Sequence, residues 1–457
     1  MNRKRRHHGG FTIVELLVAS TVGLLLVIGV IEAFRQIANA VNKGRATVQL
    51  SGQLRNVTNL LREDFRGITV QATPNTTAAS AMGYFEIIEG VDNDSISSSG
   101  GLDTLTGDTD DVLMFTSRRL GEPFSGRVFV GMDDNGIRSY ETITSPNAEI
   151  IYWLDRGIWD GSAQLQHNEM PLFTLRRRAL LIRPDLNEDY YSNGELVYAG
   201  VIIVDNVVPK YNSLTVKNFL NENDISVRVN PDGTLSANTL SDLTLRQNRV
   251  AHKRSPAGFP FNPFDPIYLP HQSDDRTENV YSLGEDVVMD QVIGFDVRVY
   301  DPLVKIVADT TTGSEPLTPS DHGYRNLALN AAIGHGAYVD LGFASRIGLT
   351  QAQVEGTALC VDTSYRPQLG NYNVYDTWTI EYERDGLDQN TNGVVDEGSN
   401  GIDNNPNVNA GVDDATEREA PPPYSVPLRG FQVIVRAFQT SQQQTRQFTI
   451  THDFTPE

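Results

Sequence analysis

An uncharged run of sixteen residues, Leu16–Ile31, constrains this chain more than any other feature. Glu15 precedes it, and four cations lie among residues 3–6. The stretch Phe11–Ile31 would form about 31 Å of helix at 1.5 Å per residue, which is enough to span a bilayer. Because the Lys and Arg excess comes first, we expect residues 1–10 to be cytoplasmic and the body of the protein to lie outside the inner membrane.

Two ordinary explanations leave part of this segment unexplained. A cleaved signal peptide has an apolar stretch of about 7–15 residues that ends at a small-x-small site. Here the apolar run continues past Val18-Ala19-Ser20. A plain membrane anchor has no use for Glu15, because a carboxylate in hydrocarbon costs on the order of 3 kcal/mol unless it is paired.

The segment Gly10-Phe11-Thr12-Ile13-Val14-Glu15 resembles the N-terminal signal of type IV pilins and type II secretion pseudopilins. The resemblance implies that a prepilin peptidase cleaves between Gly10 and Phe11 and methylates the new amino terminus. Glu15 would then pair with the Phe11 ammonium group of a neighbouring subunit. Since an unpaired carboxylate is costly in the membrane, subunits that supply the partner are favoured.

Helical periodicity continues beyond the apolar run. Apolar residues recur at steps of three and four along Phe34–Val48, and on a displaced stripe along Leu50–Ile68. Gly67, directly after Arg66, is a typical helix stop. The pattern predicts one helix from Phe11 to about Arg66, roughly 84 Å long. A coiled coil is the alternative, and the short, shifting stripe disfavours it.

The sequence after Gly67 predicts strands, because β-branched and aromatic residues alternate there with polar ones. A hairpin is expected at the end of the chain. The expected strands are Asp111–Ser117, Arg127–Met132, Glu149–Leu154, Leu172–Ile182, Leu196–Ile203, Gln291–Tyr300, Phe431–Phe438 and Gln447–Phe454. The Arg176–Arg178 run is expected on a solvated strand edge, and a subdomain is expected within the insertion 209–282.

The predicted fold class is therefore α+β, with a long helical stem, half of it transmembrane, packed on a β-rich globular head as in pilins. Segments within 110–116, 148–154 and 175–177 resemble the minor pseudopilins of the J type and related minor pilins. The predicted divisions are a leader (1–10), a transmembrane and assembly half-helix (11–34), an amphipathic half-helix (35–67) and a periplasmic head (68–457) that contains an Asp/Asn-rich loop (384–414).

Composition restricts the partners and the stabilising chemistry of the head. Beyond the leader, the net charge is about −25, so nucleic acid and anionic lipid headgroups should repel it. Cys360 is the only cysteine, so no intrachain disulfide can form, and we expect it in the core. Long loops must then be held by packing or by a metal ion.

One loop has the spacing of a calcium site. Oxygen-bearing side chains stand at relative positions 1, 3, 5 and 9, with Gly393 at position 6, as in EF-hand loops. The predicted Ca²⁺ ligands are Asp388, Asn390, Asn392, the Val394 carbonyl, Asp396, and Glu397 or Asp403 in place of the usual Glu at position 12. A degenerate copy follows from Gly401. The alternative is a flexible acidic loop of turn-forming residues.

No nucleophile elbow, phosphate loop, dinucleotide fingerprint or zinc-type histidine pair is present in the sequence. We therefore expect a non-enzymatic, minor, tip-proximal subunit of a type II secretion pseudopilus or type IV pilus. Its expected partners are prepilin peptidase, other pilin-like subunits and the membrane. A calcium-dependent adhesin carried on a pilus or anchored in the membrane is the alternative, and a secreted enzyme on a membrane stem is a third, weaker one.

Overall fold

The computed structural model describes residues 12–80, 82–90, 108–132, 137–155, 166–167, 170–203, 208, 219–250, 286–309, 315–321, 324, 332–346, 348–349, 354, 357, 359–360, 373–405, 411–440 and 444–454. The chain forms two compact units. One contains Met1–Arg55 with Gln439–Gln444, and the other contains Asn56–Phe438 with Thr445–Glu457.

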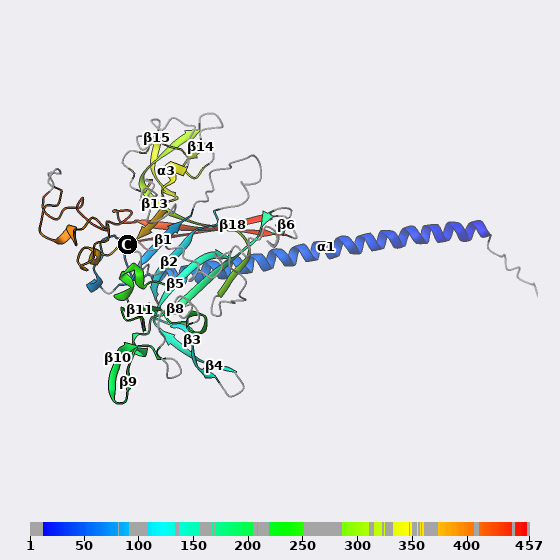
Figure 1. Ribbon diagram of the computed structural model, residues 1–457. Helices are drawn as coiled ribbons and strands as arrows, with labels where there is room; N and C mark the ends of the chain where they lie inside the picture. The colour runs from blue at the N-terminus through cyan, green and yellow to red at the C-terminus, as the bar shows by residue number, and fades with distance from the viewer. Residues whose placement is uncertain are drawn as a thin grey trace, which may run out of the picture. The chain divides into compact units, whose positions relative to one another are not determined.

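Helix α1 (Ile13–Arg66) is a single helix of 54 residues (Figure 1). The predicted helix is thus confirmed from Ile13 to its end at Arg66, while Phe11 lies outside the described residues. The large apolar side chains of the uncharged run are exposed, from 51% for Val22 to 68% for Leu16. A globular core buries such side chains, so this half of α1 requires another apolar environment.

A ten-stranded sheet is the main element of the second unit (Figure 1). Neighbouring strands pair antiparallel from the edge strand Asn373–Asp376 to the strand Gly430–Gln439. In spatial order the strands are β16 (Asn373–Asp376), β1 (Phe85–Glu89), β2 (Val112–Arg118), β5 (Asn147–Asp155), β8 (Phe173–Leu181), β13 (Asp286–Asp309), β17 (Gly430–Gln439) and β18 (Gln444–Asp453). Strands β14 (Glu315–Leu317) and β15 (Ala332–Val339) also pair with β13.

Four two-stranded ribbons and several short helices complete the described elements. The ribbons are β3 (Phe124–Met132) with β4 (Arg138–Ser145), β6 (Gln166–His167) with β7 (Met170–Pro171), β9 (Glu188–Ser192) with β10 (Glu195–Val201), and β11 (Val227–Val229) with β12 (Leu235–Ala237). The short helices are α3 (Phe343–Arg346) and the 3₁₀ turns Ala78–Ser80, Pro184–Leu186, Asp242–Thr244, Arg246–Asn248, Ile380–Glu383 and Glu397–Ser399.

All eight strands expected from the sequence are present within a few residues, including the C-terminal pair β17 and β18. The sequence missed the 24-residue length of β13. It also missed ten of the described strands: β1, β4, β6, β7, β9, β11, β12, β14, β15 and β16. The expectation that Arg176–Arg178 lies on a solvated edge is wrong. Strand β8 is an interior strand between β5 and β13, and Arg177 and Arg178 are buried.

The C-terminal part of α1 covers one face of this sheet. Val57, Leu61 and Phe65 are buried at helical spacing, as the amphipathic stripe predicted. The Phe65 ring packs edge-on against Phe115 of β2 and Phe431 of β17, with ring centroids 5.7 and 5.0 Å apart. Each such aromatic pair contributes about 0.5–1.5 kcal/mol beyond area burial.

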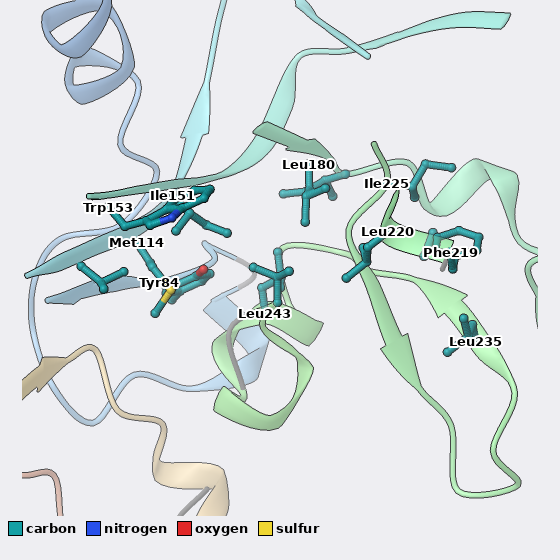
Figure 2. Packing of buried hydrophobic residues seen from close by; sticks show 14 of the residues in the cluster. Tyr84, Met114, Ile151, Trp153, Leu180, Phe219, Leu220, Ile225, Leu235 and Leu243 are labelled. Carbon is teal, nitrogen blue, oxygen red and sulfur yellow. The ribbon is translucent and has the colours of Figure 1, made fainter. Parts of the chain in front are cut away.

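Residues 219–250 cover the opposite face (Figure 2). Phe219, Leu220 and Leu243 pack in one cluster with Met114 of β2 and Trp153 of β5. The described part of the 209–282 insertion therefore shares its core with the sheet. Because both faces are covered, β1 and β5 read as nearly continuous buried runs rather than as alternating ones.

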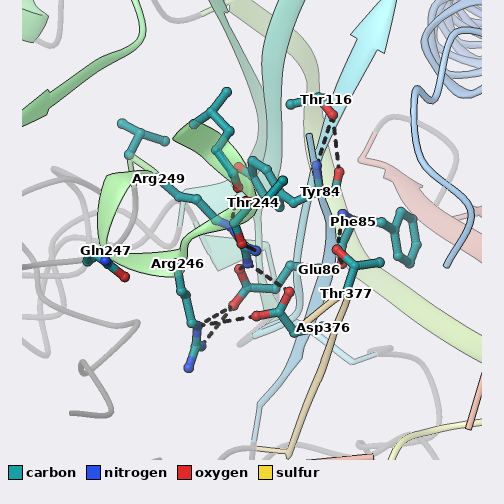
Figure 3. Close-up of polar contacts among 12 residues, drawn as sticks. Tyr84, Phe85, Glu86, Thr116, Thr244, Arg246, Gln247, Arg249, Asp376 and Thr377 are labelled. Atoms are coloured by element: carbon teal, nitrogen blue, oxygen red, sulfur yellow. Dashed lines mark hydrogen bonds and ion pairs between the residues drawn. The ribbon is translucent and has the colours of Figure 1, made fainter. Parts of the chain in front are cut away.

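Four buried charges fasten this insertion to the sheet edge (Figure 3). Arg249 donates hydrogen bonds of 2.9 Å to Glu86 on β1 and 2.8 Å to Asp376 on β16, and Arg246 donates one of 2.8 Å to Glu86. All four side chains are fully buried. Burial raises the pKa of Asp376 to about 6, although Arg249 opposes the shift.

Candidate functional sites: the start of helix α1 and a repeated Asp/Asn loop

Glu15 closes a capping box at the start of α1. Its Oε2 accepts hydrogen bonds from the Thr12 backbone N–H at 2.9 Å and the Thr12 hydroxyl at 3.0 Å. The Thr12 hydroxyl oxygen accepts in return from the Glu15 N–H at 3.2 Å. This reciprocal pattern satisfies two of the helix's first N–H groups. Gly10 and Phe11, the predicted processing residues, lie outside the described residues.

The residues that follow Glu15 have the composition of a membrane span. An 18-residue window of α1 has a mean hydropathy of 2.5, and none of that window is buried. In the described part of the chain, α1 is the one helix long and apolar enough to cross a bilayer. An exposed apolar helix that starts beside Glu15 is the arrangement that the N-terminal signal predicts, and the Thr12 cap is an addition to it.

Asp64, at the other end of α1, makes a buried polar contact with the sheet. It accepts hydrogen bonds from Arg177 Nε at 2.7 Å, Tyr152 Oη at 2.6 Å and Arg119 Nη2 at 2.8 Å. Its side chain is fully buried. Burial, and next the Asp64 carboxylate, raise the pKa of Tyr152 well above its ordinary value. The run of arginines thus supplies a structural ion pair that holds the helix end.

The first Asp/Asn loop gathers most of the predicted calcium ligands. Asp388 accepts from the backbone N–H groups of Asn392 and Gly393, at 3.2 and 2.8 Å. The side chains of Asn390 and Asn392 both reach Glu397, at 2.8 and 2.7 Å. Glu397, rather than a residue at position 12, therefore faces the Asn side chains of this loop.

Two other predicted ligands lie elsewhere in the loop. The carboxylate of Asp396 faces the Gly386 N–H, at 3.1 and 3.2 Å, so it closes the loop's entry. Asp403 belongs to the next turn, where it occupies the position that Asp388 has in the first. The structure brings together Asp388, Asn390, Asn392 and Glu397, and it gives Asp396 a different contact.

Sequence reasoning missed Glu419, which contacts the first loop from beyond its end. Its carboxylate accepts hydrogen bonds from the backbone N–H groups of Gln389 and Asp396. Burial, opposed by the two N–H groups and aided by Asp388, raises the pKa of Glu419 to about 7. The Glu-Arg-Glu run at 417–419 carries no spacing signal that could have pointed to this contact.

The second copy repeats the backbone geometry of the first. The Gly401 N–H donates to Asp413 at 2.8 Å, as the Gly386 N–H does to Asp396. The two glycines have φ of 74° and 78°, and the two aspartates have φ of 53° and 56°. Glycine adopts such positive φ values without steric cost. The repeat seen in the sequence is therefore also a repeat in structure.

The end of the repeated loop is anchored in the core of the head. The Trp378 indole N–H donates to the Ala420 carbonyl at 2.7 Å, and the Tyr382 hydroxyl accepts from the Arg246 N–H at 2.8 Å. Glu383 accepts from the N–H groups of Glu419 and Ala420. Both ends of the loop are thereby fixed beside the buried charges shown in Figure 3.

A cluster of three buried carboxylates lies inside the sheet. Carboxylate oxygens of Glu89, Asp108 and Asp111 lie within 4.8 Å of one another, and all three residues are buried. Burial, and next Asp111, raise the pKa of Asp108 well above its ordinary value. Asp111 accepts from Val297 N–H at 2.7 Å, and Glu89 accepts from Leu341 N–H at 3.3 Å. These bonds tie β1 and β2 to β13 and to residue 341.

Residues 5–31 match the model of the prokaryotic N-terminal methylation motif. This match supports a type IV pilin-like signal, and it points to processing by a prepilin peptidase, assembly with other pilins and a structural subunit rather than an enzyme. An apolar helix with such a signal fits anchoring in a membrane. No curated protein and no solved structure matches the chain.

Proposed function

We propose that the chain is a minor subunit of a type IV pilus or type II secretion pseudopilus. The methylation motif at 5–31, continued by an exposed apolar helix, carries this proposal. Prepilin peptidase cleaves between Gly10 and Phe11 and methylates Phe11. The apolar half of α1 lies in the inner membrane before assembly, and the head lies in the periplasm or on an extracellular filament.

Glu15 selects the neighbouring subunit in this proposal. In the free subunit its carboxylate caps its own helix through Thr12. In the assembled bundle it pairs with the Phe11 ammonium group of a neighbour. A paired carboxylate is more stable in the low-dielectric bundle than an unpaired carboxylate exposed to hydrocarbon. The capping box is then exchanged for a contact between subunits.

We place the subunit near the filament tip, and nearest the J-type minor pseudopilins. The head contains ribbons and insertions in addition to its main sheet, including β9–β10, β3–β4 and residues 219–250, and these make the head large. Repeated packing along a filament shaft leaves little room for such a head, whereas a tip position has one free side.

A calcium-dependent adhesin is the second candidate, and the repeated loop is the observation that favours it. Asp388, Asn390, Asn392 and Glu397 would hold Ca²⁺, which prefers carboxylate and amide oxygens. The ligands would be the carboxylates of Asp388 and Glu397 and the amide oxygens of Asn390 and Asn392, which lie in one loop. Both amide groups would turn on binding, because their nitrogens donate to Glu397 in this structure. Bound Ca²⁺ would supply positive charge and order the loop, because the chain has no disulfide to do so.

Mass spectrometry of the mature amino terminus tests the main proposal. We expect the protein isolated from membranes to begin with methylated Phe11. A chain that keeps its basic leader, or one cleaved near Ala19, would rule out the pilin assignment. A prepilin peptidase deletion strain is the matched control, and there the leader should remain.

A further inference from the structure

The two Asp/Asn repeats present the same pair of aliphatic side chains to solvent. Leu387 is 62% exposed and Val395 is 43% exposed in the first repeat. Ile402 and Val412, which hold the equivalent positions in the second, are 59% and 57% exposed. Single exposed apolar residues are normal on a protein surface, but these four recur at matching positions of a repeated loop that is rich in polar and turn-forming residues.

The backbone geometry makes each pair a unit. In the first repeat the bond between Gly386 N–H and Asp396 joins the immediate neighbours of Leu387 and Val395. In the second repeat the Gly401–Asp413 bond does the same for the other pair. In both repeats the exposed aliphatic residues are next to the Gly and the Asp that form this hydrogen bond. Their exposure is therefore a property of the repeat and does not come from one irregular turn.

The charge around these aliphatic pairs is mostly negative. Residues 384–419 contain nine Asp and Glu side chains and two basic residues, Arg384 and Arg418. Anionic lipid, nucleic acid and a second copy of this strongly acidic chain would all be repelled by such a surface. A surface with aliphatic side chains bordered by lysine or arginine complements it in both charge and polarity.

We infer that the two aliphatic pairs form a bivalent docking surface for a protein partner whose aliphatic side chains are bordered by Lys or Arg. The surface consists of Leu387, Val395, Ile402 and Val412. Each repeat supplies one apolar contact, and the surrounding carboxylates attract and orient the partner. Two linked contacts bind more tightly than either alone. The inference concerns the surface of the head and does not rest on the processing of the stem or on bound calcium.

The test uses the full chain in detergent and a synthetic amphipathic peptide of leucine and lysine, with calcium present throughout. A peptide of the same pattern with glutamate in place of lysine is the charge control. We expect the lysine peptide to bind about tenfold more tightly than the glutamate peptide. The double variant L387S/I402S should weaken binding of the lysine peptide about fivefold, since each serine removes an apolar contact.

The variant Leu120→Ser is the matched control, because Leu120 is the most exposed large apolar residue described in the head, at 93%, and lies outside the repeats. It should bind like the unmodified chain. The stem and the detergent are common to all variants, so differences report on the loops. A second double variant, V395S/V412S, should repeat the loss. Equal binding by the unmodified chain and both double variants, or a preference for the glutamate peptide, overturns the inference.

Discussion

Asp64 on helix α1 and Arg177 on strand β8 are joined by two hydrogen bonds, 2.7 and 3.2 Å long, across 113 residues of sequence. Both side chains are buried. The pair fixes the last turn of α1 against the middle of the sheet. It also explains why a strand in the interior of the sheet contains consecutive arginines.

We expect Asp64→Ala to destabilise the head by about 3–5 kcal/mol, because Arg177 would keep a buried charge without its main carboxylate partner. Chemical denaturation followed by tryptophan fluorescence measures this. Glu63→Ala is the control, since Glu63 is half exposed and its contact with Arg119 is 3.6 Å long. Its cost should stay below about 1 kcal/mol. Equal costs for the two variants would contradict the role given to Asp64.

Glu15→Ala should leave membrane insertion intact and reduce incorporation into filaments about tenfold or more, because the pairing with a neighbour's amino terminus is lost. Shearing of filaments and quantitative immunoblotting measure the incorporated fraction. Glu32→Ala, which removes an exposed partner of Arg35 on the same helix, should assemble normally. Normal incorporation of the Glu15 variant would rule out the selection role.

Chelation of calcium should lower the melting temperature of the head by several degrees. A ligand at one hundred times its dissociation constant stabilises the folded state by about 2.7 kcal/mol. Asp388→Ala should melt early even with calcium, and chelation should then have little further effect. Asp185→Ala, which removes an exposed partner of Arg183, is the control and should still respond to the chelator. Identical melting with and without chelator would remove the calcium proposal.

The stability of the head should depend on pH through His452. Burial lowers the pKa of His452, although Asp453 opposes this, and the imidazole lies among the rings of Phe65, Phe431 and Phe454. The unfolded chain then binds more protons than the folded one below about pH 6.5. The contribution of neutral His452 to the stability of the head is complete above that pH. It is lost as the pH falls through the pKa that His452 has in the folded head.

Denaturation midpoints measured between pH 5 and 8 check this expectation. His452→Phe keeps the ring packing and should flatten the acid side of the profile. His335→Phe makes the same substitution on β15, outside this ring cluster, and is the control for the exchange of residue type. If the head instead became more stable on acidification, and His452→Phe removed that gain, the expected pH dependence would be wrong.

The elements that sequence reasoning predicted are those specified by local pattern. The helix from Ile13 to Arg66 follows from steps of three and four, and strands such as β2 and β17 follow from β-branched and aromatic content. The buried partners of the Arg176–Arg178 run were not predictable, because Asp64 and Asp224 are distant in sequence. Long-range contacts of this kind leave no periodic signal.

The calcium-like loop also combines local contacts, which spacing predicts, with contacts that spacing does not predict. Spacing alone indicated that Asp388, Asn390 and Asn392 share a turn, since turn geometry is local. It did not indicate that Asp396 would close the entry of the loop, or that Glu419 would contact it from beyond the second repeat. The Glu419 contact depends on how the chain returns after residue 411. The Glu15 capping box was equally local, yet the Thr12–Glu15 spacing was not used to predict it.

Because the last turns of helix α1 pack on one face of β2 and residues 219–250 pack on the other, this part of the sheet is closed to other molecules. Recognition is then left to the other strands, the ribbons and the connecting segments. Substitutions there can change what the head recognises while the interior stays the same. A head built in this way can acquire a new binding partner without first losing its fold.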